Sequence, residues 1–458
     1  MRLIACCKFI LIIIFSTTYL SACSSGSGSG QSLIDYFDGL IILPANDGFH
    51  GNELWISDGT ADGTVMVKDI NPGSGHSYPA NFIKFNGKYY FAADDGTSGK
   101  ELWVSDGTAV GTVMVKDINP GAGNGSPGLF SVINDRLVFT ATNGIAGVEL
   151  WISDGTPNGT IMLKDIRPGV GSSQPVHFTE YKGRLYFNAE GIEGRELWTS
   201  DSTTDGTFLV KDIGIYVGSG DPHELTVFND RLYFSATTID YGYELWVSDG
   251  TTEGTVMLKD IYPGVGTSEP HELTVVNNRL IFRAIDENGI GIWRSDGTAS
   301  GTILVKLLAL SALGNPPEFF TAVNDQLYFS YSELWVSNGT TDGTFMVKDI
   351  NPNTGDHPWS LWGYNGRLYF TADDGNHGRE LWVSDGTDNG TYLLKDMNVG
   401  IDNSGANFIT NLNGLSYFAA SNNNEGRELW VTDGTTTGTE MVVDINPGAG
   451  SGIEYLFP

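Results

Sequence analysis

The sequence predicts an all-β protein, a β-propeller of four-stranded antiparallel blades, and it favours nine blades in one ring. Three observations support this prediction. A core motif containing Trp recurs nine times, at positions 55, 103, 151, 198, 246, 293, 335, 382 and 430, with one unit every 42 to 48 residues. Each unit holds four short segments rich in β-branched and aromatic residues. No segment combines helical apolar periodicity with capping residues.

The fifth unit illustrates the four predicted strands, which we term A to D. They cover residues 225–229, 231–236, 244–248 and 255–261. The A–B connection is Asn-Asp here and Asn-Gly in other units, which is typical of a two-residue hairpin. The B–C and C–D connections contain glycines, which permit positive φ. Four antiparallel strands in roughly 40–50 residues are typical of a propeller blade.

Contacts between units explain the repeated Trp. One four-stranded sheet cannot bury both of its faces alone, so neighbouring blades stabilise each other, and each buried indole removes about 150–250 Å² from water. Two smaller rings would satisfy the same pattern, but no linker separates any two units. We therefore expect one ring over residues 33–458. Residues 455–458 match only the start of a strand A, so we expect no long strand exchange at ring closure.

The first residues have the features of a secretory leader. Arg2 and Lys8 flank a short positive region, and the apolar run at 9–15 is too short for a stable membrane span. The following Leu-Ser-Ala-Cys, which ends at Cys23, resembles the lipobox of bacterial lipoproteins. The resemblance implies a signal peptide over residues 1–22 and lipidation of Cys23. The alternative is an ordinary small-residue cleavage site that contains a cysteine.

The cysteine count agrees with the lipoprotein interpretation. Cys6 and Cys7 lie inside the leader, so the predicted mature chain has one cysteine and no internal disulfide. Residues 23–32 comprise the lipidated Cys23 and a flexible Gly/Ser tether. The residue after Cys23 is Ser24 and not Asp. In this respect the sequence resembles Gram-negative lipoproteins that are exported to the outer membrane. We therefore expect a membrane partner through the lipid anchor, with display in the bacterial envelope, at the outer membrane or cell surface.

The charge balance excludes one class of partner. The chain has 458 residues, 25 basic and 55 acidic, with a formal net charge of −30. Nucleic acid is a poor partner for such a chain, because phosphate binding requires clustered Lys and Arg. Aromatic residues make up 12% of the chain, which argues against a disordered acidic protein.

The repeated motif itself resembles a known family. Glu-Leu-Trp-x-Ser-Asp-Gly-Thr, as at residues 101–108, is similar to the bacterial ELWxxDGT repeat family, and the resemblance covers about residues 33–458. It implies a secreted or surface-attached repeat protein, a propeller, with no established activity. Three units depart from the pattern: the fourth has Ser202 for Gly, the sixth has Gly291 for Glu, and the seventh has Asn338 for Asp.

Residues present in every unit are expected to be structural, because a function located at one place does not need nine copies. The motif Glu and the Lys-Asp pair that follows strand D are expected to bond backbone or basic neighbours. Asp69 and its counterparts are expected to brace the turn that follows them. We expect no cofactor. Calcium in the Asp-Gly loops is not supported by the sequence, because no loop has EF-hand spacing.

Function is expected where the units differ, on the face that carries the B–C and D–A loops. At the residue that follows a Pro just before strand A, four consecutive units carry His223, His271, Glu318 and Trp359. Because strand neighbours point to opposite faces, His223 and Glu224 are not expected to face the channel together. Two His and one Glu resemble zinc ligands, but packed sheets stand ~10 Å apart and metal bonds are ~2 Å. Whether a metal binds is left open.

A second irregularity lies in the same sector. The B–C hairpin of the seventh unit is shortened, and the preceding D–A link, residues 307–313, is apolar and includes Leu308 and Leu310. One interpretation is a notch with an apolar lip, which would mark an interaction site. The other is decay of one repeat, with Leu308 and Leu310 packed into the core.

The favoured function is a non-enzymatic, cell-surface lipoprotein whose propeller binds a protein, glycan or other ligand on its B–C/D–A face. The predicted site comprises His223, His271, Glu318, Trp359, Leu308 and Leu310, with no catalytic residue. One alternative is an envelope-associated glycan hydrolase or lyase that uses Glu224, Glu272 or Glu318, because paired carboxylates can perform acid–base chemistry. Another is a purely structural or adhesive envelope protein.

Overall fold

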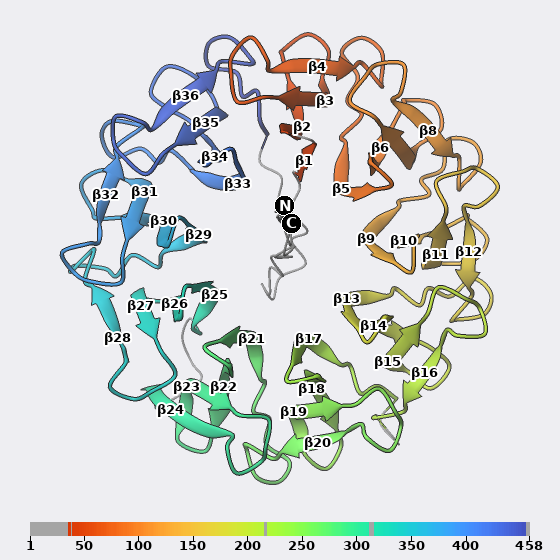
Figure 1. Ribbon diagram of the computed structural model, residues 1–458, viewed down its shortest axis with the longest axis vertical. Helices are drawn as coiled ribbons and strands as arrows, with labels where there is room; N and C mark the ends of the chain where they lie inside the picture. Colours follow the sequence, from red (N-terminus) through yellow and green to blue (C-terminus); the bar gives the residue numbers. More distant parts are fainter. Residues whose placement is uncertain (1–34, 38, 215–217, 311–315, 455–458) are drawn as a thin grey trace, which may run out of the picture.

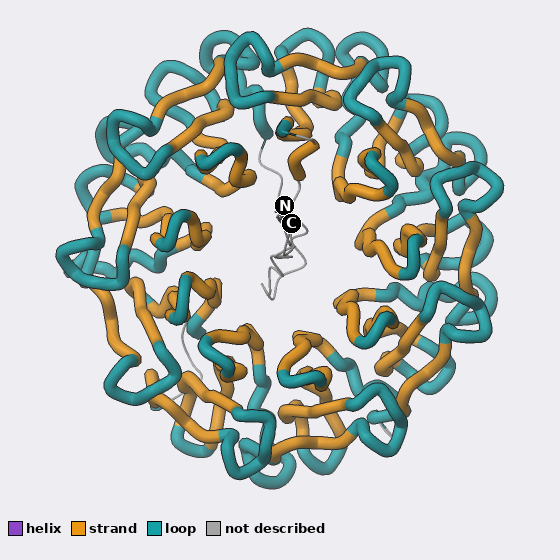
Figure 2. The backbone as a smooth tube through the Cα atoms, in the orientation of Figure 1, coloured by secondary structure: helices purple, strands orange, loops and turns teal. Residues whose placement is uncertain are grey.

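A computed structural model describes residues 35–37, 39–214, 218–310 and 316–454. The expected leader (1–22), Cys23 and the tether (23–32) lie outside the described residues, as does the chain end at 455–458. The described residues form strands and loops only (Figure 2). No helix in this part of the chain is long and apolar enough to cross a membrane.

The described strands form nine four-stranded antiparallel sheets arranged in a ring, which confirms the predicted nine-bladed propeller (Figure 1). In each blade the four strands follow one another in sequence order, and the first strand lies nearest the centre of the ring. The first five blades are β1 (Asp35–Phe37), β2 (Leu40–Asn46), β3 (Asn52–Ser57), β4 (Val65–Lys68); β5 (Ala80–Phe85), β6 (Lys88–Asp94), β7 (Lys100–Ser105), β8 (Val113–Lys116); β9 (Gly128–Ile133), β10 (Arg136–Ala141), β11 (Glu149–Ser153), β12 (Ile161–Lys164); β13 (Val176–Tyr181), β14 (Arg184–Glu190), β15 (Arg195–Ser200), β16 (Phe208–Lys211); and β17 (His223–Phe228), β18 (Arg231–Thr238), β19 (Gly242–Ser248), β20 (Val256–Lys259).

The last four blades follow the same order. They are β21 (His271–Val276), β22 (Arg279–Asp286), β23 (Gly289–Ser295), β24 (Ile303–Ala309); β25 (Glu318–Val323), β26 (Gln326–Tyr331), β27 (Glu333–Ser337), β28 (Thr344–Lys348); β29 (Trp359–Tyr364), β30 (Arg367–Asp373), β31 (Arg379–Ser384), β32 (Tyr392–Lys395); and β33 (Asn407–Leu412), β34 (Leu415–Ala420), β35 (Glu428–Thr432), β36 (Glu440–Val443). We number the blades 1 to 9 in chain order.

The core lies between neighbouring blades. Each apolar cluster combines two consecutive blades; Trp151 of blade 3, for example, packs with Leu102 and Val104 of blade 2. The ring closes by the same contact, because Ile41 and Leu43 of blade 1 pack with Leu429 of blade 9. The backbone N–H of Asn46 also donates to the carbonyl of Gly452 at 2.8 Å. Within the described residues the ring therefore closes without exchange of a strand, as predicted.

The repeated charged residues hold the blades and their links, as expected. The motif Glu is buried in all eight blades that have it. In blade 2, Glu101 accepts hydrogen bonds from the N–H groups of Ile118 (2.6 Å) and Gly125 (2.7 Å). Lys68 donates to the carbonyl of Thr112 in the next blade at 2.7 Å. The Asp69 carboxylate accepts from the N–H of Gly73 at 3.1 Å, which braces the turn.

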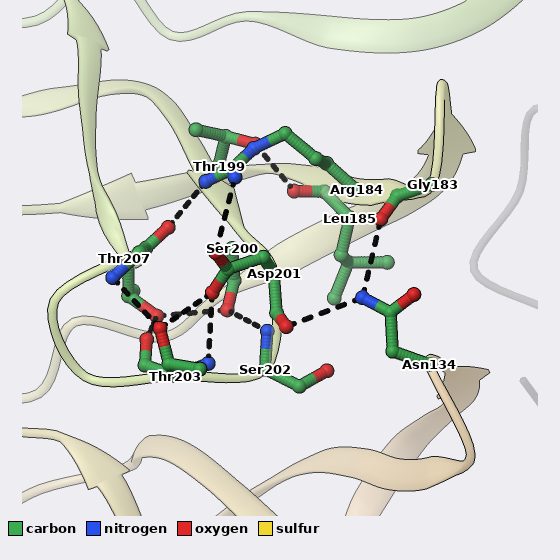
Figure 3. A network of polar contacts seen from close by, with 11 residues as sticks. Asn134, Gly183, Arg184, Leu185, Thr199, Ser200, Asp201, Ser202, Thr203 and Thr207 are labelled. Atoms are coloured by element: carbon green, nitrogen blue, oxygen red, sulfur yellow. Dashed lines mark hydrogen bonds and ion pairs between the residues drawn. The ribbon is translucent and has the colours of Figure 1, made fainter.

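The C–D turn, on the face opposite the B–C and D–A loops, keeps the same hydrogen bonds even where its sequence departs from the repeat. In blade 4, Asp201 accepts from the N–H of Thr203 at 3.0 Å, and Ser202 adopts the positive φ (72°) that glycine adopts in other units (Figure 3). Asn134 of blade 3 donates to the carbonyls of Gly183 and Asp201, both at 3.2 Å (Figure 3). This face therefore repeats one scaffold turn from blade to blade.

Candidate ligand-binding site on the inner strands of blades 5 to 8

The structure places the four predicted residues His223, His271, Glu318 and Trp359 at the same position, the first residue of the innermost strand in blades 5, 6, 7 and 8. We call these four residues the inner arc. Their strands β17, β21, β25 and β29 are neighbours in that order around the ring. Each arc residue is paired across the sheet with a residue of the second strand, as His223 is with Ser235 and His271 with Arg283.

A bulge at the start of each inner strand determines where the next side chain lies. The residue after the arc position has a positive φ: 62° at Glu224, 62° at Glu272 and 59° at Phe319. The strand register shifts at the same place, as in a β-bulge. The expected alternation does not hold here, because the His223 and Glu224 side chains both contact His271. The His223 and His271 ring centroids are 4.8 Å apart, and Glu224 Oε1 is 3.3 Å from His271 Nδ1.

Two of the three candidate acids tie one blade to the next. Glu224 Oε2 accepts hydrogen bonds from the N–H groups of Glu272 (3.0 Å) and Leu273 (3.4 Å) at the start of β21. Glu272 makes the equivalent bonds to the N–H groups of Phe319 (3.3 Å) and Phe320 (3.1 Å) at the start of β25. These carboxylates position the inner strands, since each accepts backbone N–H groups of the next blade, and the other Glu224 oxygen contacts His271.

The charge state of Glu224 agrees with this role. Burial alone would raise the pKa of its carboxyl, but the hydrogen bond and positive charge of His271, with a further contribution from His223, outweigh burial and the pKa is lowered. Glu224 is therefore an ionised acceptor at neutral pH. A general acid needs a proton to give at that pH, so Glu224 does not fit the acid of the hydrolase alternative.

His223 presents an acceptor with no partner. Its Nδ1 lies 3.0 Å from the carbonyl oxygen of Asp221; because a carbonyl only accepts, Nδ1 carries the hydrogen and Nε2 is the acceptor of the neutral ring. Burial is the main reason that the pKa of His223 is lowered, so the ring is neutral at pH 7. His223 Nε2 is buried and has no hydrogen-bond partner within the described chain.

Polar residues that the sequence interpretation missed support this ring from blades 4 and 5. The Tyr243 hydroxyl donates to Asp221 Oδ2 at 2.9 Å, and Asn188 Nδ2 donates to Asp221 Oδ1 at 3.1 Å. Arg195 in turn donates to Asn188 Oδ1 at 3.1 Å. The Tyr243 ring meets His223 edge-on, with centroids 5.3 Å apart. His223 is thus held on two sides and has little freedom to change its orientation.

Arg283 is the most unusual residue beside the arc, and the sequence interpretation missed it too. It occupies the fifth position of the predicted strand B, where the other eight units carry uncharged residues: Pro44, Ala92, Thr140, Asn188, Ser235, Ser330, Thr371 and Ala419. The side chain is half-buried, and its guanidinium forms no hydrogen bond or ion pair within the described chain; its Nε is buried without a partner. Burial lowers the pKa of Arg283, although nearby Glu272, Glu318 and Glu224 act in the opposite direction.

Glu318 and Trp359 complete the arc. Glu318 is half-buried. Trp359 is 55% exposed, and its ring packs against that of Phe319 with centroids 5.7 Å apart. Phe319 follows Glu318 in β25, so the indole is steadied by the neighbouring blade while a large part of it stays open to solvent.

The apolar link that follows blade 6 divides into two parts. Strand β24 extends to Ala309, and Leu308 packs against the core between blades 6 and 7, next to Phe320 and Phe329. Leu310 is 84% exposed, and residues 311–313 lie outside the described residues. Leu308 therefore belongs to the core, as the interpretation of a decayed repeat predicted. Among the described residues of the link, only Leu310 is exposed as the interpretation of an apolar lip predicted. Both lie at the end of the outermost strand of blade 6, away from the inner strands (Figure 1).

The glycine at position 291 explains why blade 6 differs. A Cβ at Gly291 would lie 2.6 Å from both Leu304 Cδ1 and the Lys306 carbonyl oxygen. The motif Glu is absent, and strand β24 has seven residues where most blades have four. Backbone pairing of Gly291 with Leu307 thus takes the place of the carboxylate that holds the link in other blades.

A metal centre is not formed by these residues as they stand. No three His, Cys, Asp or Glu side chains among the described residues converge in an arrangement that could hold a metal ion. Separately, a surface cavity of about 430 Å³ opens between blades 3 and 4, lined in part by Arg167, Glu190 and Ile192. Arg167 and Glu190 are paired there, 3.1 Å apart, and Glu193 is a second acidic residue of the lining.

Comparison with known proteins assigns this chain to no family. No protein-family model matches the chain, and no curated protein matches it. Among solved structures it resembles a puromycin hydrolase (TM-score 0.40, 12% identity), over 82% of this chain and 54% of that one. It also resembles a puromycin-hydrolyzing peptidase from Mycobacterium tuberculosis (TM-score 0.38, 10% identity), over 70% of this chain and 54% of that one. A third similar structure is the β-propeller domain of the Trilobed protease from Pyrococcus furiosus (TM-score 0.35, 8% identity), over 81% of this chain and 96% of that one. The chain thus spans about half the length of the two hydrolysing enzymes.

Proposed function

We propose that this protein is a non-enzymatic binding protein of the bacterial envelope that captures its ligand at the inner arc. One observation carries the proposal. The first residue of the inner strand departs from the repeat in four consecutive blades, and the Trp359 indole at this position is 55% exposed and packs against Phe319. An exposed aromatic ring held in place by a neighbour offers a ligand a large contact area at low entropic cost.

The surroundings of the arc support binding rather than chemistry. Glu224 and Glu272 are engaged with backbone N–H groups, so two of the three carboxylates that the hydrolase or lyase alternative could use hold the inner strands instead. The side chains that differ most from the repeat are a guanidinium, imidazoles and an indole, which bind and orient ligands. These side chains fit a protein, a glycan or another ligand equally well.

The proposal includes a location. The lipobox-like sequence before Cys23 supports a lipid anchor, through which the propeller would be held at the outer membrane or cell surface. Metabolic labelling with palmitate tests this part: the full chain is expected to take up the label and to sediment with membranes, and Cys23→Ser is expected to do neither. Equal labelling of the Cys23→Ser variant would refute the anchor.

The binding part is tested with soluble residues 31–458 on an array of glycans and envelope proteins. Trp359→Ala and His271→Ala are expected to weaken capture of any ligand found. Ile192→Ala is the matched control, because Ile192 is 84% exposed in a B–C loop of the same face but lies on blade 4. Capture that survives both arc changes, or that is lost equally in the control, would refute the inner arc as the site.

A further inference from the structure

The most exposed apolar side chains of the protein gather on one face of the ring. Nine large apolar side chains among the described residues are 68–90% exposed, and only Val110 of these lies in a C–D turn. The other eight lie in B–C loops or D–A links, and we call them the apolar tips: Phe49, Ile145, Val170, Ile192, Val265, Leu310, Val399 and Ile401. We propose that the apolar tips rest on the lipid surface of the membrane in which Cys23 is anchored, an inference that uses the anchor of the proposed function.

The one-sided distribution of these side chains is the first observation behind the proposal. Single exposed apolar residues are ordinary in soluble proteins. On the opposite face, however, the two variable residues of the C–D turn, apart from Val110, are Ala, Pro or polar residues, as at Thr252 and Glu253. One face of the ring is therefore suited to contact with water, and the other presents apolar side chains over most of its blades.

The chain also enters the ring from the face of the apolar tips. The D–A links lead into the inner strands, so each inner strand starts on this face and runs away from it. Strand β1 is no exception, because Asp35 pairs with Ile42 near the end of β2, where the B–C loop of blade 1 begins. Cys23 precedes Asp35 by twelve residues, which span at most ~40 Å at ~3.3–3.6 Å each. A short tether that leaves this face keeps it closer to the membrane than the opposite face.

The tether also makes weak contacts sufficient. A short flexible linker holds its two ends at an effective concentration in the mM range. Apolar side chains at an interface bind more strongly as more apolar area is buried in the headgroup region, so contacts that are individually weak add together. Docking of an anchored propeller therefore requires no single deep insertion.

Charge determines which lipid surface fits. Acidic side chains accompany the tips in the B–C loops, as Asp47 does beside Phe49 and Glu193 beside Ile192. The whole chain carries a formal charge of −30, so anionic headgroups would repel it. Zwitterionic headgroups carry no net charge and oppose docking least. The expected partner surface is therefore zwitterionic lipid.

Docking has a consequence for the inner arc. Its residues are the first of their inner strands, so the arc starts on the same face as the apolar tips. A docked propeller opens the arc toward the membrane, and a ligand presented by that membrane reaches the arc without release of the tips. The inference thus adds an orientation to the proposed binding function.

Depth-dependent quenching on vesicles tests the orientation. Residues 23–458 with Cys23→Ser and an amino-terminal polyhistidine segment are held on phosphatidylcholine vesicles by a nickel-chelating lipid, and this chain has no other cysteine. Ile192→Cys and Val265→Cys carry an NBD fluorophore, and Val110→Cys is the matched control, because Val110 is equally exposed on the opposite face. Doxyl-labelled phosphatidylcholine is expected to quench NBD at least about threefold more at Ile192→Cys and Val265→Cys than at Val110→Cys, because only the tips enter the interface.

A second set of variants connects quenching to the apolar side chains. With NBD at Ile145→Cys, the triple change Val170→Ser, Ile192→Ser and Val265→Ser is expected to lower quenching to the level of the Val110→Cys control. Val110→Ser is expected to leave it unchanged. Replacement of about a third of the phosphatidylcholine by phosphatidylglycerol is expected to lower quenching, and ~500 mM NaCl is expected to restore it, because salt screens the repulsion.

The outcomes separate docking from the proposed function. Equal quenching on both faces, or none on either while the protein stays on the vesicles, would overturn docking and leave the anchor and the inner arc in place. A dimer of the soluble chain that the triple change dissociates, without quenching on vesicles, would assign the tips to a second copy and overturn the lipid surface. A parent chain that takes up no palmitate would refute the anchor and docking in the cell with it; the vesicle result is distinct, because the polyhistidine segment there replaces the lipid.

Discussion

The clearest consequence of the structure concerns the motif Glu, and we develop it for Glu101. Its side chain is fully buried, and its two oxygens accept the N–H groups of Ile118 and Gly125. Both donors belong to buried residues of the link between blades 2 and 3. Glu101→Ala removes both acceptors and leaves the two buried N–H groups without their protein partner.

The expected cost follows from those two donors. Each buried, unsatisfied N–H costs ~1–3 kcal/mol, so the pair costs ~2–6 kcal/mol. At the middle of this range, about 4 kcal/mol, local opening of the link becomes about a thousandfold more frequent, because each 1.4 kcal/mol is a factor of ten. Glu101→Gln keeps one carbonyl acceptor and directs an amide donor at the other N–H, so an intermediate effect is expected.

Hydrogen exchange at about pH 8 measures the effect locally, in peptides that cover residues 117–126. The amides of Ile118 and Gly125 are expected to exchange far faster in Glu101→Ala than in the parent. Glu180→Ala is the control, because Glu180 is an exposed Glu of β13 and is expected to change stability by less than about 0.5 kcal/mol. Equal exchange of the link in Glu101→Ala and the parent would show that the carboxylate does not hold it.

Three further predictions concern the same scaffold. Burial raises the pKa of Glu53, Glu101, Glu196, Glu244, Glu380 and Glu428 to about 7; because this value lies above the unfolded one, the folded state binds more protons between about pH 4.5 and 7. Stability is therefore expected to fall as pH rises through that window, so that the thermal midpoint is lower at about pH 8 than at about pH 5; a higher midpoint at pH 8 would contradict this. Gly291→Glu restores the Glu of the repeated motif in blade 6. It is nevertheless expected to destabilise the protein by at least ~1–3 kcal/mol through overpacking, because the new Cβ would meet the Lys306 carbonyl oxygen. A urea unfolding midpoint at or above that of the parent would contradict this prediction. Lys116→Met removes the bonds from Lys116 to the Thr160 and Pro157 carbonyls (2.8 and 3.1 Å) and is expected to cost ~1–3 kcal/mol, whereas Lys88→Met, at an exposed position, is expected to leave the urea midpoint in place.

The repeat made the fold predictable because each blade uses the same local chemistry. Turn residues and alternating apolar segments placed the strands, and the recurring Trp placed the contact between blades. The ends of the strands were less predictable. Strand D of blade 5 was expected to reach residue 261, but β20 ends at Lys259, because the Ile261 N–H donates to the Glu244 carboxylate at 2.6 Å. A side chain thus competes with the sheet for the backbone, and sequence patterns for strands do not include that competition.

The site was only partly predictable. A comparison of units at the start of strand A indicated the four arc residues, since these depart visibly from their counterparts. The same comparison along strand B would have revealed Arg283 as the one charged residue at its position. The bulge gave no such signal. Positive φ is usually marked by glycine, but here Glu224, Glu272 and Phe319 adopt it, so the sequence indicated regular alternation where the structure has none.

That bulge has a consequence for how the binding face varies. Because it turns the second residue of the inner strand toward the next blade, Glu224 of blade 5 holds the start of β21, and Glu272 of blade 6 holds the start of β25. The positions of His271 and Glu318 are therefore fixed by a carboxylate of the preceding blade and not by a residue of the blade to which they belong. A change in one of these units is therefore expected to alter the geometry of its neighbour.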